Sequence, residues 1–252
     1  TSISTDPSAI FWNPGGIGQA KQLSFLLAYD RVIEEVGIST CAVSLPLTAN
    51  FGFAGAVSMM SLGSYDSYSD AAEPKGSKSA SSLWALGGLS FANPGWLGSN
   101  GWTGIGTEFI KDIDESTLIA FSTGTLVHIS SKWDMGVSLL HLGPEVDGFS
   151  LPSEARIGLN WSNPDRLMVA FDYSYGISSG FMSVGAGLEY LIVPLIALRG
   201  GYILPIQDST SSSTSGIRGG VGFNFKSIKL DYAIQPDLGM AISHRISLIL
   251  TI

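Results

Sequence analysis

The sequence predicts a closed, antiparallel, all-β transmembrane barrel of about fourteen strands. The hydrophobic fraction is 45%, the mean hydropathy is +0.29 and only 13% of residues are charged, against roughly 25% in an average soluble domain. No run of about eighteen apolar residues is present, so no transmembrane helix is expected. Backbone polar groups in lipid must then be paired between strands, which requires a closed barrel.

Apolar residues recur with a period of two, the spacing of a half-exposed strand. Over 166–175, Leu167, Val169, Phe171, Tyr173 and Tyr175 alternate with Arg166, Met168, Ala170, Asp172 and Ser174. One face is apolar and the other is small or charged, as expected for a lipid face and a lumen. Large apolar residues on the inner face are few, with Met168, Met182, Val184 and Leu188 as candidates if the strand near 181–191 is locally reversed.

This alternation, together with the turn residues between segments, predicts fourteen strands in one barrel domain, 19–252, after an N-terminal segment, 1–18. The expected strands are 19–30, 34–45, 50–60, 80–92, 102–111, 116–129, 133–142, 154–161, 166–175, 181–191, 195–203, 216–226, 228–235 and 242–252.

The connections differ in length at the two ends of the expected barrel. Links from odd to even strands are mostly long and polar: 62–79, 143–153, 204–215 and 236–241. Links from even to odd strands are mostly short, with 92–101 as the exception. Outer-membrane barrels have long extracellular loops and short periplasmic turns. We therefore expect a bacterial outer-membrane location, extracellular long loops and periplasmic termini.

Aromatic residues gather near both sets of strand ends. Trp133, Trp161, Tyr190 and Phe225 flank the short turns, and Tyr29, Tyr173, Tyr175 and Tyr202 lie near the opposite ends. Amphipathic rings are favoured where lipid meets water. The placement predicts two aromatic girdles, although aromatic residues are also common in strands for other reasons.

Several charged residues fall on the expected inner face. They are Arg156, Asp172, Glu189, Arg199, Arg218, Asp231 and Arg245. Because buried charges need partners, their mixed signs predict a luminal network of ion pairs. The lumen is then either a plain polar interior or a selective path for solutes.

The segment Trp12-Asn13-Pro14-Gly15-Gly16 is a turn signature, since Pro fixes φ and glycine permits positive φ. The formal charge of −8 disfavours nucleic acid as a partner. Three histidines and one cysteine leave little for a metal site or a disulfide. We expect no cofactor, no metal and no catalytic residues.

The stretch 8–17, SAIFWNPGGI, resembles the A-x-x-W-N-P-A-G-L signature near the start of PorV/PorQ-type proteins, relatives of the FadL outer-membrane barrels. Gly15 stands where that family usually has Ala. Segments 139–161, 198–202, 216–234 and 244–250 are similar to its later hairpin and closing strands. The resemblance implies that 1–18 forms a short plug in or under the lumen.

Two non-enzymatic functions follow from this resemblance. PorV-like proteins imply a membrane anchor in outer-membrane lipid that docks secreted or surface-exposed proteins. FadL-like proteins imply a passive channel for hydrophobic or small solutes. The charged inner face and the lack of an evident apolar pocket favour the anchor.

Overall fold

A computed structural model of the chain describes residues 5–33, 35–68, 74–93, 100–111, 117–145, 150–163, 166–206, 216–236 and 242–252. Two short helical segments, α1 (Ala9–Trp12) and η1 (Pro14–Gln19), precede the strands. The strands are β1 (Ser24–Arg31), β2 (Gly37–Thr48), β3 (Phe51–Tyr68), β4 (Pro74–Ala92), β5 (Gly101–Lys111), β6 (Thr117–His128), β7 (Trp133–Leu142), β8 (Glu154–Asn163), β9 (Leu167–Gly176), β10 (Met182–Val193), β11 (Ile196–Pro205), β12 (Gly216–Phe225), β13 (Ile228–Pro236) and β14 (Ile242–Thr251).

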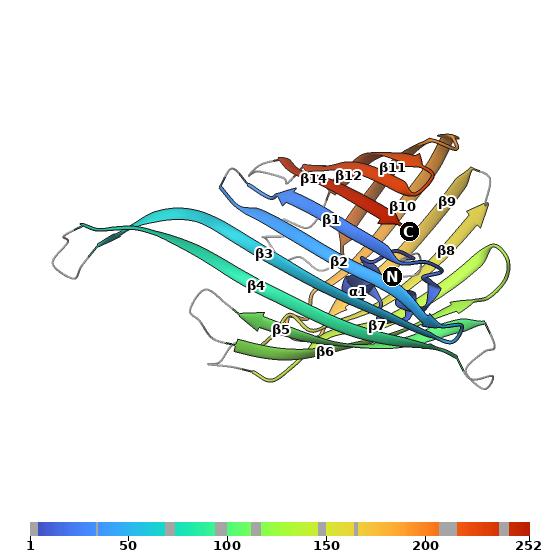
Figure 1. Ribbon diagram of the computed structural model, residues 1–252, viewed down its shortest axis with the longest axis horizontal. Helices are drawn as coiled ribbons and strands as arrows, with labels where there is room; N and C mark the ends of the chain where they lie inside the picture. The colour runs from blue at the N-terminus through green and yellow to red at the C-terminus, as the bar shows by residue number, and fades with distance from the viewer. Residues whose placement is uncertain are drawn as a thin grey trace.

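The fourteen strands form one closed antiparallel barrel in chain order (Figure 1). The last strand closes it on the first, with a register that runs from Ser24 opposite Thr251 to Arg31 opposite His244. No helix among the described residues is long and apolar enough to cross a membrane. The predicted antiparallel barrel of about fourteen strands is confirmed.

The two faces of each strand differ sharply in exposure. On β1, Phe25, Leu27 and Tyr29 point outward and are 40 to 52% exposed, whereas Leu26 points inward and is 6% exposed. Exposed apolar residues of this kind cover the outer faces of all fourteen strands. A continuous apolar outer surface suits lipid rather than water, so the barrel is a transmembrane one.

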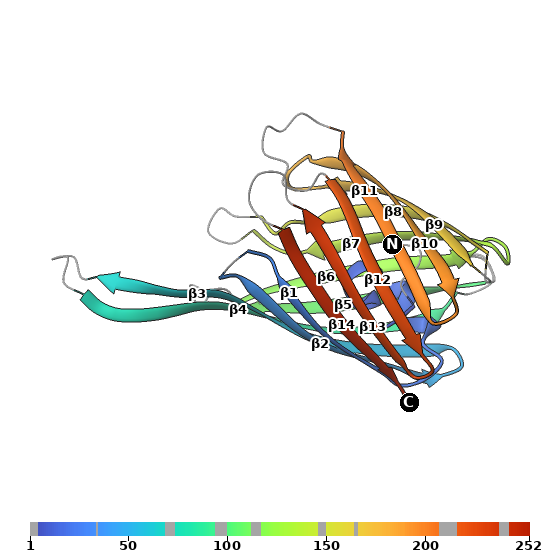
Figure 2. The same cartoon turned by 90° about the horizontal axis from the view of Figure 1, so that it is seen from above.

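The β3–β4 hairpin is much longer than the others and projects beyond the barrel (Figures 1 and 2). β3 has 18 residues and β4 has 19, and they stay paired beyond the last contacts with their neighbours, Gly37 opposite Ser61 and Leu83 opposite Lys111. The prediction of a loop over 62–79 is therefore wrong, apart from 69–73, which lie outside the described residues. Two strands satisfy each other's backbone groups without the apolar alternation that the prediction required.

Two strand starts also differ from prediction. β1 begins at Ser24 instead of residue 19, because the chain up to Gln19 forms η1 inside the barrel. β2 begins at Gly37 instead of residue 34. The other described strand ends lie close to their predicted positions, and much of the expected links 204–215 and 236–241 lies outside the described residues.

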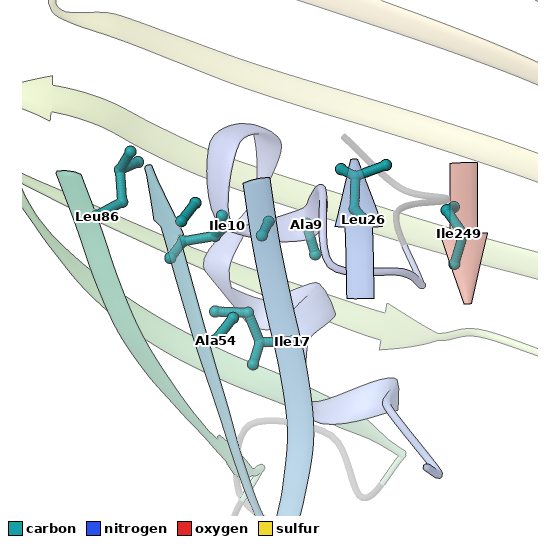
Figure 3. Packing of buried hydrophobic residues seen from close by; sticks show 9 residues of the cluster. Ala9, Ile10, Ile17, Leu26, Ala54, Leu86 and Ile249 are labelled. Atoms are coloured by element: carbon teal, nitrogen blue, oxygen red, sulfur yellow. The ribbon is translucent and has the colours of Figure 1, made fainter. Parts of the chain in front are cut away.

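The core lies between the N-terminal segment and one side of the inner wall. Figure 3 shows Ile10 and Ile17 among Ala54 and Leu86 of the wall, with Ala9 toward Leu26 and Ile249. Ile10 is 2% exposed and Ile17 is 1% exposed, so the segment is packed rather than loosely threaded. The segment therefore occupies the lumen on the β1–β6 side and leaves the opposite wall uncovered.

Close packing of this segment depends on a bare backbone at Gly104. A Cβ built there would overlap the carbonyl group of Pro14, whereas one at Gly106, also inward on β5, would meet no atom closer than 3.6 Å. We expect Gly104→Ala to lower the free energy of unfolding by about 1–3 kcal/mol, the usual cost of overpacking. Gly106→Ala is the matched control. Urea titration in lipid vesicles, followed by tryptophan fluorescence, checks this; equal midpoints for the two variants would contradict it.

Candidate functional site

The N-terminal segment is tied to the barrel wall by specific hydrogen bonds. Asn13 begins η1, and its Oδ1 accepts a hydrogen bond from the Gly15 backbone N–H at 2.9 Å. Its Nδ2 donates to the Thr125 carbonyl at 3.2 Å. The Ser138 hydroxyl donates to the Trp12 carbonyl at 3.0 Å. One motif thus caps its own helix and binds β6 and β7, forming a luminal plug.

The glycines of the motif allow the plug backbone to approach the barrel wall closely and are not needed for a turn of the chain. Neither Gly15 nor Gly16 has positive φ, so the expected turn is instead a 3-10 helix with Pro14 at its start. A Cβ on Gly15 would lie 2.7 Å from the Trp102 carbonyl oxygen and 2.9 Å from that of Gly124. The missing side chain lets the plug backbone lie directly against the wall.

Beside the plug, the lumen contains a cavity of about 1100 Å³. It lies between the plug and the uncovered wall, toward the end where odd strands lead to even ones. Its lining includes Asp6, Ser8 and Trp12 of the plug, Asp30, Val32, Ile38, Pro152, Ser153, Glu154, Arg156, Asp172, Ser174, Phe181, Ser183, Gly185, Gly187, Gly201, Ile203, Arg218, Ala233, Gln235, Ser243 and Arg245. A volume of this size holds a small organic molecule.

The apolar part of this lining was not anticipated. Val184 and Leu188 are 36% and 50% exposed on the outer face, so β10 is not reversed. Apolar cavity residues come instead from the plug, as Trp12, from the barrel end, as Val32 and Phe181, and from the inner face of strands, as Ile38 and Ile203. Strand alternation does not reveal Trp12, Val32 and Phe181, because these three stand outside regular strands.

Two of the predicted luminal arginines are paired at the cavity wall. Arg156 forms an ion pair with Glu154 at 2.6 Å, and its guanidinium lies 5.1 Å from the Trp12 ring centroid. That geometry favours a cation–π interaction. Arg245 pairs with Asp30 across the β1–β14 seam. Both acidic partners were missed by the sequence analysis.

The remaining predicted charges of the cavity wall are Arg218 and Asp172. Arg218 has no ion-pair partner among the described residues and repels the nearby guanidinium of Arg245. It therefore presents a positive charge to a cavity whose lining also includes the acidic residues Asp6, Glu154 and Asp172. The expected single network is instead several separate groups.

Below the cavity, three predicted charges meet in one cluster. Arg199 Nε lies 2.5 Å from Glu189 Oε2, and Arg199 also pairs with Asp231. Glu189 and Arg199 are direct cross-strand partners, and the bare Gly222 leaves room for the guanidinium to reach Asp231. The cluster spans β10 to β13 nearer the end with the short turns.

A second polar cluster, on β5 to β7, was not predicted. Glu108 accepts hydrogen bonds from Ser122 Oγ at 2.5 Å and from the His141 ring at 2.8 Å. His141 has φ of 57° at a β-bulge, which turns its ring into the lumen against Trp84. Because the Ser122 hydroxyl donates to the carboxylate and not to the imidazole, these residues do not form a nucleophile–base pair.

A third cluster lies at the end with the short turns. His128 Nδ1 lies 2.5 Å from Asp134 Oδ1, and Asn160 Nδ2 donates to the other Asp134 oxygen at 3.1 Å. Among the described residues, no group of three His, Cys, Asp or Glu could hold a metal ion. The polar clusters connect neighbouring strands of the wall. The cavity is therefore the candidate functional site.

All eight residues of the predicted girdles lie in strands with their side chains on the outer face. Trp133 lies opposite Trp161 near one end of the barrel, and Tyr190 and Phe225 lie toward that same end. Tyr29, Tyr173, Tyr175 and Tyr202 lie toward the other end. Their contact with the lipid–water boundary stays a prediction.

No family model and no curated protein matches the sequence. Among solved structures, the Pseudomonas putida toluene transporter TodX aligns with a TM-score of 0.71 at 12% identity, over 98% of this chain and 94% of TodX. A deltaS2 mutant of the TodX monoaromatic hydrocarbon channel gives 0.67 at 12% identity, over 99% and 95%. A Pseudomonas aeruginosa FadL homologue gives 0.60 at 12% identity, over 98% and 94%.

The chain shares the fold of these barrels. At such low identity the likeness extends to the fold alone and not to the solute. It bears out the FadL side of the resemblance stated above, while the PorV/PorQ side stays a prediction.

The ion-pair assignments lead to a stability prediction. Arg199→Met leaves Glu189 and Asp231 facing each other without their shared cation, so it should lower the free energy of unfolding by about 1–3 kcal/mol. Arg218→Met removes an inward arginine that has no ion-pair partner within the described ranges and is the matched control. Urea unfolding in vesicles measures both. A loss for Arg218→Met as large as that for Arg199→Met would show that the cluster adds nothing specific.

Proposed function

We propose that this protein is a passive, non-enzymatic channel of the bacterial outer membrane that admits small hydrophobic molecules. The observation that carries the proposal is the luminal cavity of about 1100 Å³ beside the plug. Trp12, Val32, Ile38 and Phe181 give it apolar surface, while its charged groups are mostly paired with one another. An apolar pocket with a few polar groups is the usual form of a small-molecule site.

The comparisons support a channel. TodX is described as a toluene transporter and as a monoaromatic hydrocarbon channel, and its barrel has the same fold. Toluene is small enough for the cavity, and the Trp12 ring at the cavity wall offers an aromatic contact. The plug borders the cavity on one side, and the cluster of Arg199, Glu189 and Asp231 lies below it.

Docking of secreted or surface-exposed proteins, the function that the PorV-like sequence motifs imply, is the second candidate. The observation that favours it is the projecting β3–β4 hairpin, whose outer part pairs with no other strand in the part of the chain that the structure describes. Such a ribbon offers backbone groups for strand addition by a partner. A stoichiometric protein that stays bound through purification in detergent would support docking.

Two glycines on the neighbouring strands β10 and β11 provide a test of the channel. Gly187 lines the cavity, whereas Gly200 on the neighbouring strand points outward, and a Cβ at either position meets no atom closer than 3.7 Å. Gly187→Phe should fill part of the cavity and reduce uptake severalfold, while Gly200→Phe should leave it unchanged. The measurement is the uptake rate of N-phenyl-1-naphthylamine by Gram-negative cells that produce each variant.

Equal surface amounts of the folded variants, judged by heat-modifiable migration on gels, are the control for this assay. If cells with the unaltered protein take up the dye no faster than cells without it, the channel is refuted. If Gly187→Phe and Gly200→Phe slow uptake equally, the route does not pass through the cavity.

The proposed orientation places the odd-to-even links outside the cell and both termini in the periplasm. Exposed residues mark the two ends: Ser179 follows β9, and Lys132 precedes β7. In a Cys41→Ala background, Ser179→Cys should react with a membrane-impermeant maleimide on intact cells, and Lys132→Cys should react only after lysis. The reverse labelling would invert the barrel.

A further inference from the structure

A polar group stands on the lipid-facing side of the β13–β14–β1 wall, at the barrel end where β1 finishes. On the outer face, Arg31 lies directly opposite His244, and Tyr29 lies directly opposite Ile246. The Tyr232 hydroxyl lies 2.8 Å from His244 Nδ1, and the two rings stack with centroids 6.2 Å apart. Arg31, His244 and Tyr232 are all exposed.

These groups have unused donors. Asp30, next to Arg31, points inward and pairs with Arg245, so it does not neutralise Arg31. Arg31 has no ion-pair partner among the described residues. Nδ1 of His244 is occupied by the Tyr232 hydroxyl, so Nε2 is the ring nitrogen left to meet a ligand. A guanidinium and an imidazole nitrogen are therefore adjacent on this face, and together they suit an anion.

An apolar groove of about 270 Å³ begins directly beside this group. Leu27, Leu230, Ile246 and Leu248 form its apolar sides, and the small side chains of Ser39 and Cys41 leave it hollow. Along β1 and β14 the order is Arg31 with His244, then Tyr29 with Ile246, then Leu27 with Leu248. The chemistry changes from cationic to aromatic to aliphatic toward the middle of the barrel wall.

We propose that this face binds one phosphate-bearing membrane lipid. Its phosphate contacts Arg31 and His244, and one acyl chain lies in the groove. The order of side chains matches the order of chemistry in a lipid, from anionic headgroup through interface to hydrocarbon. The charge is complementary, and the surrounding surface already faces the membrane.

The chain offers a matched control for the cation. Lys111 also points outward at the same barrel end, where β5 finishes, but its cross-strand partners are Leu83 and Thr117. It lacks both the imidazole and the stacked ring. If general attraction to anionic lipid were the only effect, Lys111 and Arg31 would matter equally.

The test is native mass spectrometry of the full chain in non-ionic detergent with dioleoylphosphatidylglycerol. We expect one retained lipid per barrel, with Arg31→Ala weakening retention about fivefold, as for one lipid-facing cation. Arg31→Ala/His244→Ala should weaken it further, and Lys111→Ala should not. Cys41→Phe, which fills the groove, should weaken retention with Arg31 intact.

Further control experiments identify the molecule that occupies this face. Dioleoylglycerol, which has the same acyl chains without phosphate, should not be retained, and inorganic phosphate should not displace the bound lipid. Equal retention of dioleoylglycerol, displacement by inorganic phosphate, or lipid-free dimers at the expense of the lipid-bound form would each overturn the proposal. So would equal retention by the double variant and the unaltered chain, once heat-modifiable migration shows both are folded. None of these outcomes depends on the channel function.

Discussion

The structure depends on one constraint, the closure of the backbone hydrogen-bond network between β1 and β14. Ser24 lies opposite Thr251, 227 residues away in the chain, and their hydroxyls lie 3.2 Å apart at the seam. Because β1 and β14 pair along their length, the seam leaves no strand edge in the apolar outer surface. Closure also places alternate residues of each strand on the inner and the outer face of the barrel.

The inner face uses small residues for two different purposes. On β5, Gly104 lies against the backbone of the plug, and on β6, Gly124 lies against the Asn13 side chain, both at distances that no further side chain would permit. On β10 and β11, Gly187 and Gly201 face no plug and leave the cavity open. The position of the plug, rather than the composition of the wall, decides which glycines pack and which line a space. Charges then join strands where space remains, as Arg199 does with Glu189 and Asp231.

Parts of the site were predictable because they follow from strand alternation. All seven predicted luminal charges point inward, because each occupies a polar position in a strand where apolar and polar residues clearly alternate. The ion-pair partners of these charges were harder to predict, because pairing depends on the register between strands. Glu189 is the direct cross-strand neighbour of Arg199, while Asp30 reaches Arg245 only because β1 and β14 pair at the seam. His141 enters the lumen through a bulge that breaks alternation, so its contact with Glu108 had no signal in the sequence. The extension of β3 and β4 beyond the barrel was not predicted for a similar reason, because two paired strands need no alternation of apolar residues.

By itself, the sequence determined the barrel, the number of strands, their two faces and the presence of a distinct N-terminal motif. These properties follow from local chemistry, since apolar alternation without a long apolar run has one stable arrangement in lipid. Only the tertiary structure decided where the plug lies, which half of the lumen stays open and which charges pair. It also brought Arg31 beside His244 above an apolar groove. Those features depend on contacts between residues far apart in the chain, and registers and close approaches of that kind leave no periodic pattern to read.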